Sequence, residues 1–214
     1  MKKVYPSRSQ RRDGLATRAV ILEAAVRVFA ERGFSDATSK EICEHANANN
    51  AAVNYYFGGK DALYAEVLRE AHRQMVSLED LNEIVESSAS PEDKLRAFLE
   101  LLLRAASDPE KRWGIKVFLR ELASPSPHVV GAVTTVILPK AERLRELILE
   151  LTGLPLDSPQ AQRAVVFAAL PSISLIMFPD SLRTRILPAT ATSDAGMLDD
   201  MMRYILAGLH ALKQ

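Results

Sequence analysis

The chain has 214 residues, of which 48% are hydrophobic and 25% charged, with equal numbers of basic and acidic residues. This composition is typical of a soluble globular protein, and no apolar run reaches membrane-spanning length, so we expect no membrane partner. The single cysteine, Cys43, cannot form an intramolecular disulfide, which agrees with a cytoplasmic location.

Charge is unevenly distributed along the chain. Residues 1–60 hold ten Lys and Arg against six Asp and Glu, whereas the remainder holds seventeen against twenty-one. A basic N-terminal part suits contact with phosphate. We expect residues 1–16 to form a flexible basic arm, which either stays in solvent or contacts DNA. The basic residues of this arm are Lys2, Lys3, Arg8, Arg11 and Arg12.

Residues 38–57 predict two short helices joined by a tight turn. Thr38 and Glu41 have the spacing of a capping box. In this motif the hydroxyl accepts a hydrogen bond from an early N–H of the helix, and the carboxylate reaches back toward the capping residue. Cys43 lies on the small apolar face of the first helix, which favours core packing over a thiol sensor. Asn47 follows where the chain reverses, and Asn tolerates a left-handed conformation. Asn49 can cap a second helix, and the pair predicts a helix-turn-helix.

The second helix carries side chains that can contact DNA. Asn50 and Asn54 share one helical face and can read adenine edges. Tyr55, Tyr56 and Lys60 can contact phosphate. The alternative is a buried helix pair with a polar turn and no DNA-binding role. The predicted DNA-contact residues are Thr38, Ser39, Lys40, Asn49, Asn50, Ala51, Asn54, Tyr55, Tyr56 and Lys60.

Beyond residue 60 the apolar periodicity remains helical. It predicts one long helix from Lys60 to about Glu86, and then a helix that begins at Ser90 and Pro91. Two further helices follow, to about residue 122 and to residue 151, the second with a kink at Pro139. The last two span about 159–178 and 194–212. No strand pattern is present, so we predict an all-α fold of about nine helices.

Residues 17–72 resemble the DNA-binding domain of the tetracycline-repressor (TetR) family of bacterial transcription regulators. The sequence departs from the family pattern at Asn47, Asn54 and Gly59. The departure at Asn54 affects a predicted DNA contact and so bears on which operator sequence is read. The matching residues are Thr17, Arg18, Ile21, Leu22, Ala25, Phe29, Gly33, Phe34, Thr38, Ser39, Ile42, Ala46 to Phe57, Lys60, Leu63 and Tyr64. The stretch from Arg120 to Pro127 resembles a subgroup with some members linked to drug efflux and antibiotic response.

The resemblance implies a domain division and a function. Residues 17–62 would form the helix-turn-helix domain, and residues 63–214 a ligand-binding and dimerisation domain. Such a protein is most often a repressor that binds a palindromic double-stranded DNA operator as a homodimer and is released by a small molecule.

Apolar stripes on the last two predicted helices favour dimerisation. Two helices from each of two chains would close a four-helix bundle, as the resemblance implies. The alternative is that the stripes complete the core of the monomer. The predicted interface residues are Val166, Ile173, Leu198, Met201, Met202, Ile205 and Leu209.

The helices between residues 90 and 178 are expected to enclose a pocket for an apolar or aromatic effector. The alternative for each predicted pocket residue is ordinary core packing. The predicted residues are Phe98, Leu102, Trp113, Val117, Phe167 and Met177.

Catalysis has little support in the sequence. His72 lacks a second histidine at metal-binding spacing, and His128 is expected to be exposed. We therefore expect no enzyme, no metal and no cofactor. Two hypotheses remain: a ligand-responsive DNA-binding regulator, and a helical small-molecule or partner-binding protein without operator-specific DNA binding.

Overall fold

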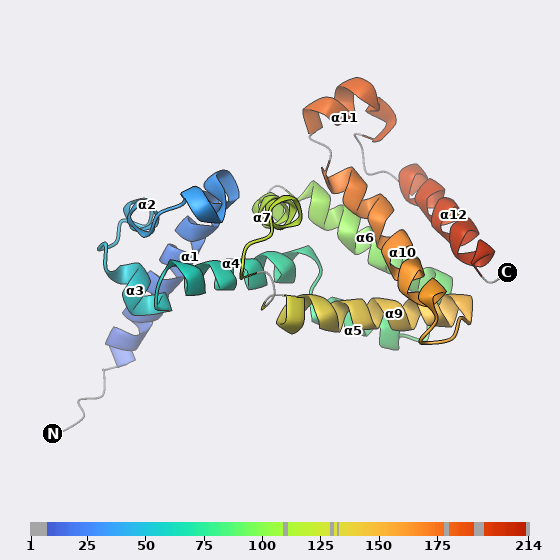
Figure 1. Cartoon of the computed structure of the whole chain (residues 1–214), viewed down its shortest axis with the longest axis horizontal. Coiled ribbons are helices and arrows are strands. Elements are labelled where there is room, and N and C mark those ends of the chain that lie inside the picture. The colour runs from blue at the N-terminus through green and yellow to red at the C-terminus, as the bar shows by residue number, and fades with distance from the viewer. Residues whose placement is uncertain are drawn as a thin grey trace.

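The computed structural model describes residues 8–108, 111–128, 131, 133–177, 180–190 and 195–212. All regular elements within these ranges are helical, which confirms the all-α prediction. The first four helices are α1 (Arg8–Asp36), α2 (Ser39–His45), α3 (Ala52–Phe57) and α4 (Lys60–Met75). In Figure 1, α1, α2 and α3 cluster at one end of the molecule, and α4 leads from them into a larger helical body.

The larger body contains the remaining helices. In chain order these are α5 (Leu78–Glu86), α6 (Pro91–Ser107), α7 (Arg112–Ala123), a π-helical segment (Val133–Ile137), α9 (Leu138–Thr152), α10 (Pro159–Met177), α11 (Asp180–Ile186), a 3-10 turn (Pro188–Thr190) and α12 (Ala195–Ala211). The boundaries of α6, α10 and α12 agree with the prediction to within two residues, whereas α11 was not predicted. None of the described helices is both long and apolar enough to cross a membrane.

The N-terminal helix is longer than expected. Because α1 begins at Arg8, residues 8–16 of the predicted flexible arm are helical. This stretch contains no proline, so a helix that is stable further along the chain can extend through it. The arm residues 1–7, with Lys2 and Lys3, lie outside the described part of the chain.

The prediction of one helix from residue 60 to residue 86 was wrong. Val76 is extended (φ −146°, ψ 120°), and the Ser77 hydroxyl accepts a hydrogen bond from the Asp80 N–H at 2.9 Å. This cap starts α5 as a separate helix. The apolar period runs across the break because Val76 and Leu81 enter the same core. Pro139, expected to kink a helix, lies in the first turn of α9, directly after the π-helical segment Val133–Ile137.

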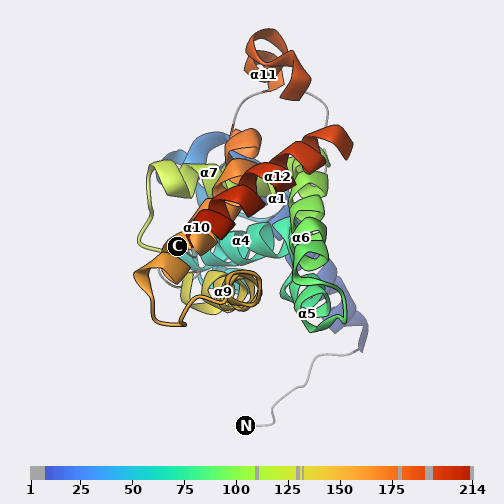
Figure 2. The same ribbon diagram turned by 90° about the vertical axis from the view of Figure 1, so that its right-hand side faces the viewer.

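Two hydrophobic cores divide the chain at the C-terminal end of α4. The first core joins α1–α4 with Val117 of α7, and includes Tyr64 and Ala71 of α4. The second core begins at Val76 and joins α5, α6, α9, α10 and α12. The first core thus extends along α4 past residue 62, as far as Ala71, and the domain boundary at residue 62 stays a prediction. Figure 2 views the opposite end of the molecule, where α10 and α12 lie in front.

Candidate DNA-binding surface and effector cavity

The turn between α2 and α3 is held by its own side chains. The Thr38 hydroxyl accepts from the Glu41 N–H at 3.1 Å, as predicted, while the Glu41 carboxylate pairs with Arg32 at 3.3 Å. Asn47 takes the left-handed conformation (φ 48°), which confirms its place at the chain reversal. The Asn49 side chain accepts from the Ala51 N–H at 2.9 Å and so stabilises the turn that leads into α3.

The second helix of the motif is shorter than predicted. Because α3 begins at Ala52, Asn50 and Ala51 belong to the turn before it and not to the helix itself. Gly58 ends α3 in the left-handed conformation (φ 82°), and the Gly58 N–H bonds to the Asn54 carbonyl at 3.0 Å. The motif nevertheless packs as a unit, because Ile42 and Val53 are fully buried in the first core.

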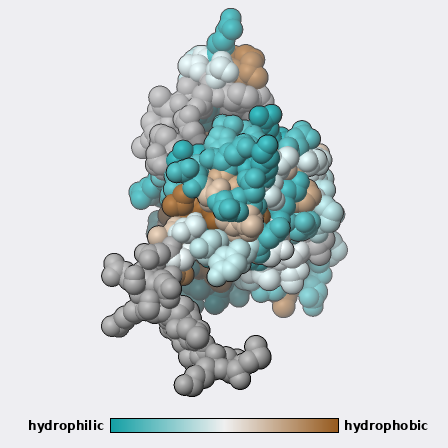
Figure 3. Space-filling view, turned by 90° about the vertical axis from the view of Figure 1, so that its left-hand side faces the viewer, coloured by the Kyte–Doolittle hydropathy of each residue, from teal (hydrophilic) through white to brown (hydrophobic). Residues whose placement is uncertain are grey.

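The outer face of this motif is polar and aromatic. Tyr55 is 81% exposed, and its ring meets the half-buried Tyr56 edge-on, with 4.8 Å between ring centroids. Figure 3 views this end of the molecule, where hydrophilic residues cover most of the surface that is drawn in colour. The exposed predicted contact residues are Thr38, Lys40, Asn49, Asn50, Ala51, Asn54 and Tyr55, and Ser39 is half-buried.

Lys60 has a different role from the phosphate contact that the sequence predicts. Its ammonium donates to the carbonyls of Phe34 (2.8 Å) and Ala37 (2.9 Å), and lies 4.4 Å from the centroid of the Phe34 ring. Lys60 therefore joins the start of α4 to the segment between α1 and α2. The sequence could not reveal this role, because it depends on a contact across 23 to 26 residues.

Basic residues on α1 and α2 are also engaged within the molecule. Arg18 pairs with Glu66 at 3.1 Å and stacks on the Phe57 ring, and Arg27 pairs with Glu23. Lys40, whose side chain is 73% exposed, lies 3.7 Å from Glu44. Such an exposed pair is weak, so the Lys40 ammonium can turn to a phosphate at little cost.

The C-terminal end of α7 is fastened to α1. The Arg120 guanidinium donates to the carbonyls of Ala30 (3.2 Å) and Glu31 (2.5 Å). These carbonyls lack helical partners because Gly33 (φ 78°) breaks α1 just beyond them. A side chain at Gly33 would be strained, and its Cβ would lie 3.2 Å from the guanidinium.

Glu121 forms a second connection, to α4. Its carboxylate accepts from the Tyr64 hydroxyl at 2.5 Å and from the Ser126 N–H and hydroxyl at 3.0 Å each. Burial, together with this hydrogen bond, raises the pKa of Tyr64 far above its usual value. Tyr64 therefore remains a donor, and the buried Glu121 is held by three donors.

His128 completes the connection, although it was expected to be exposed. Its Nε2 lies 3.1 Å from the Asp61 carboxylate in the first turn of α4, and its ring meets the Phe34 ring at 4.8 Å. The loop after α7 thus reaches back to the DNA-binding end. The group formed by Arg120, Glu121, Ser126 and His128 is called the interdomain clamp below.

A cavity of about 420 Å³ lies among α4, α5, α6, α7, α9 and α10. Phe98 and Leu102, which the sequence predicts as pocket residues, lie in its wall, together with Phe118 of α7. Two polar residues also line it: His72 of α4 and Lys140 of α9. The Lys140 ammonium donates to the His72 carbonyl at 2.5 Å.

Three other predicted pocket residues lie elsewhere. Trp113 borders a separate, more polar hollow beside Arg73 and Gln74. Val117 is fully buried in the first core, and Phe167 is 52% exposed on the outer face of α10. Aromatic and aliphatic periodicity shows that a side chain is apolar, but not which space it faces. The side chain of Met177 lies outside the described part of the structure.

The burial of His72 predicts an acid-sensitive component of stability. Burial, and to a lesser extent the charge of Lys140, lowers the pKa of His72 to about 4. As the pH falls from about 6.5 to about 4, the unfolded chain takes up a proton here but the folded chain does not, so stability falls. Over this window, we expect the unfolding free energy of the His72→Leu variant to fall by roughly 2–3 kcal/mol less than that of the wild type.

Denaturant unfolding at a series of pH values measures this difference. His210→Leu is the matched control, since His210 is exposed on α12. The prediction fails if the wild type and both variants lose stability in parallel.

The predicted dimer stripe on α12 is buried within the monomer. Leu198, Met201, Met202, Ile205 and Leu209 are each at most 7% exposed and belong to the second core, so in the single chain they leave little surface for a second subunit, as the alternative of core packing predicts. The periodicity marks an apolar face without showing what covers it. Ile173 is half-buried and lines the cavity, whereas Val166 is 51% exposed.

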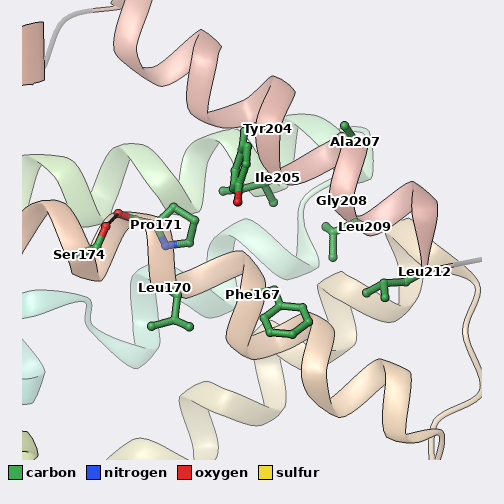
Figure 4. Close-up of a pocket in the computed structure, with 10 residues that line it drawn as sticks. All are labelled: Phe167, Leu170, Pro171, Ser174, Tyr204, Ile205, Ala207, Gly208, Leu209 and Leu212. Atoms are coloured by element: carbon green, nitrogen blue, oxygen red, sulfur yellow. Dashed lines mark hydrogen bonds between the residues drawn. The ribbon is translucent and has the colours of Figure 1, made fainter.

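A different apolar face of α10 and α12 remains uncovered. Phe167 (52% exposed), Leu170 (47%) and Tyr204 (73%) border a hollow of about 650 Å³ between the two helices. Figure 4 shows these side chains, and the small residues Ala207 and Gly208 beside them on α12. Small residues allow a second helix to approach closely.

Comparison with known proteins identifies the family. A model described as "Bacterial regulatory proteins, tetR family" matches residues 21–67, and one described as "HTH-type transcriptional dual regulator CecR, C-terminal domain" matches residues 91–210. The HTH-type transcriptional regulator BetI of Brucella canis is 30% identical over 89 residues, which cover 42% of this chain and 44% of BetI. The chain thus aligns with less than half the length of this curated relative.

Solved structures share the fold at low sequence identity. FadR from Bacillus subtilis, in complex with stearoyl-CoA, has a TM-score of 0.67 and 16% identity, covering 89% of this chain and 98% of FadR. A TetR family transcription regulator from Marinobacter aquaeolei VT8 has a TM-score of 0.65 and 18% identity, covering 93% and 97%. The CecR model covers more than half of the chain and the tetR model covers its DNA-binding helices, so the chain belongs to the tetR family of bacterial regulatory proteins and carries a C-terminal domain of the CecR type.

Proposed function

We propose that this protein is a transcriptional regulator that binds a palindromic DNA operator as a homodimer and releases it when a small molecule fills the cavity. One observation carries the proposal: α4 leads from the exposed helix-turn-helix face to the wall of the cavity. A ligand that repositions α4 therefore changes the position of α3. The FadR structure of similar fold holds stearoyl-CoA, which is consistent with a small-molecule effector.

The proposed dimer uses the uncovered face of α10 and α12. A palindromic operator has two-fold symmetry, so two copies of the helix-turn-helix must be related by a two-fold axis. Phe167, Leu170 and Tyr204 are exposed apolar side chains on these two helices and border the hollow between them. Their burial against the same face of a second copy would close a four-helix bundle.

The interdomain clamp supports a mechanical route between cavity and DNA. Phe118 of α7 lines the cavity, and Arg120 and Glu121 on the next turn bind α1 and α4. A ligand must bind better to the conformation in which the two α3 helices no longer match the operator spacing. By reciprocity, operator DNA then weakens ligand binding by the same factor.

Selection from a pool of random duplexes tests the proposed function. We expect the wild-type protein to enrich an inverted repeat. Enrichment of no sequence above background would favour the alternative of a ligand-binding protein without operator-specific DNA binding.

Base reading is expected to centre on Asn54, with Tyr55 on phosphate. Against the selected duplex, Asn54→Ala should lose ~1–3 kcal/mol of binding free energy if the amide pairs with a base, with a smaller loss on a scrambled duplex. Tyr55→Phe should weaken binding to both duplexes equally. Mobility shifts measure both, with Gln160→Ala as control because Gln160 is exposed at the start of α10. Equal losses on both duplexes for Asn54→Ala would show that Asn54 does not read a base.

A further inference from the structure

The polar end of the cavity holds a cation without a counter-ion. Lys140 pairs with no Asp or Glu in the described part of the chain, and burial lowers the pKa of its ammonium to about 8. Its recorded partner is the neutral carbonyl of His72. Lys140 is half-buried, and a charge withdrawn from water is costly unless an opposite charge is close, so this position favours an anion.

The His72 imidazole faces the same space. Its ring contacts Phe118 edge-on, with 5.1 Å between centroids, and no described residue hydrogen-bonds to its nitrogen atoms. The imidazole can therefore donate one hydrogen bond to a ligand. Lys140 and His72 are the only ionisable residues among the described residues of the cavity wall, and the other wall residues are apolar.

We propose that the cavity binds an apolar molecule that ends in a single carboxylate, with the carboxylate on Lys140 and His72 and the apolar body between α6 and α10. This inference rests on the proposed function and specifies the effector of that same site. A cationic ligand is disfavoured because the described wall contains no acidic residue and already holds one cation.

A phosphate group fits this end less well than a carboxylate. His72 lies in the last turn of α4, where the free carbonyls and the helix dipole place partial negative charge. One ammonium can offset this partial negative charge when the ligand carries a single negative charge, but not when the ligand carries the two charges of a phosphate monoester. Among the residues that the structure describes, the wall also lacks an arginine, the residue best suited to hold phosphate in two-point contact.

The proposed contact also provides a link to the DNA-binding end. At present the Lys140 ammonium caps the C-terminal end of α4 through the His72 carbonyl. A carboxylate would compete for that ammonium and withdraw the cap. Because α4 begins at Lys60, next to the helix-turn-helix, a change at its far end can be transmitted along the helix.

Isothermal titration calorimetry on the protein alone tests the ligand class. The probes are decanoate, decanol and decylamine, which share one chain and differ in the end group. We expect decanoate to bind at least about tenfold more tightly than decanol, as a charge-assisted contact implies, and decylamine to bind most weakly. Equal binding of decanoate and decanol, or preference for decylamine, would overturn the proposal.

Two variants locate the carboxylate. Lys140→Met keeps the apolar stem and should abolish the preference for decanoate over decanol while leaving decanol binding unchanged, and Lys140→Arg should retain the preference. Lys116→Met is the matched control, since Lys116 is exposed on α7. A preference that survives in folded Lys140→Met would contradict the assigned contact. These titrations contain no DNA, so their failure is distinct from failure of the duplex selection.

Discussion

Replacing Phe167 and Tyr204 together by glutamate is expected to yield a folded monomer with greatly weakened operator binding. Both side chains are more than half exposed in the single chain, so the changes should leave its core intact. In the proposed dimer the same positions are buried, and two unpaired carboxylates from each copy would face each other. A dimer binds both half-sites at once, which raises operator affinity by a factor of the order of 10²–10⁴ over that of a monomer. The monomeric variant should therefore bind the operator about 100-fold or more weakly.

Light scattering and mobility shifts measure the two effects, and circular dichroism verifies the helical content. Leu156→Glu is the matched control, because Leu156 is 53% exposed in the loop between α9 and α10. Ile205→Glu should behave differently and unfold the domain, since Ile205 is 3% exposed in the second core. If the Phe167 and Tyr204 double variant remains a dimer, the two-fold axis lies at another surface.

Removal of the Glu121 carboxylate is expected to destabilise the junction between α4 and α7. In Glu121→Ala the buried Tyr64 hydroxyl loses its acceptor, and the Ser126 N–H and hydroxyl lose theirs. An unpaired buried polar group costs about 1–3 kcal/mol, so the free energy of unfolding should fall by roughly 2–4 kcal/mol in total. Amide hydrogen exchange should also accelerate at the end of α1, which the adjacent Arg120 caps.

A double-mutant cycle with Tyr64→Phe separates the hydrogen bond from the lost packing. Since Tyr64→Phe removes the hydroxyl that Glu121→Ala leaves unpaired, the double variant should be about 1–2 kcal/mol more stable than additivity predicts. Glu100→Ala is the control, because Glu100 forms an exposed pair with Arg104 on α6 and should change stability by less than about 0.5 kcal/mol. Additive behaviour of the Tyr64 and Glu121 variants would exclude an energetic connection between these two residues.

The sequence alone determined the local features of the DNA-binding end. Thr38 as a cap, Asn47 in the left-handed conformation and Cys43 in the core all follow from interactions within a few residues. The start of α6 and the end of α9 were also predictable, since Ser90 and Pro91 start a helix and Gly153 stops one by their own backbone chemistry. The family followed from the same segment, because its motif is contiguous in the sequence.

The tertiary structure decided which partner each apolar or charged side chain meets. Met201 and Ile205 have the same spacing whether the stripe faces a second subunit or the chain's own core, and only the position of α6, α9 and α10 resolves this. Lys60 is a cation near a DNA-binding motif in the sequence, but its ammonium reaches two carbonyls of the preceding segment.

The same holds for the connections between the two ends of the molecule. Arg120 lies about 90 residues from the carbonyls that it caps, and Lys140 lies 68 residues from the His72 carbonyl. No local pattern encodes such pairs, because a long flexible side chain can reach many acceptors and the fold alone determines which one is near. The sequence thus established a helical regulator with a helix-turn-helix, whereas the fold placed the clamp, the cavity and the uncovered face of α10 and α12.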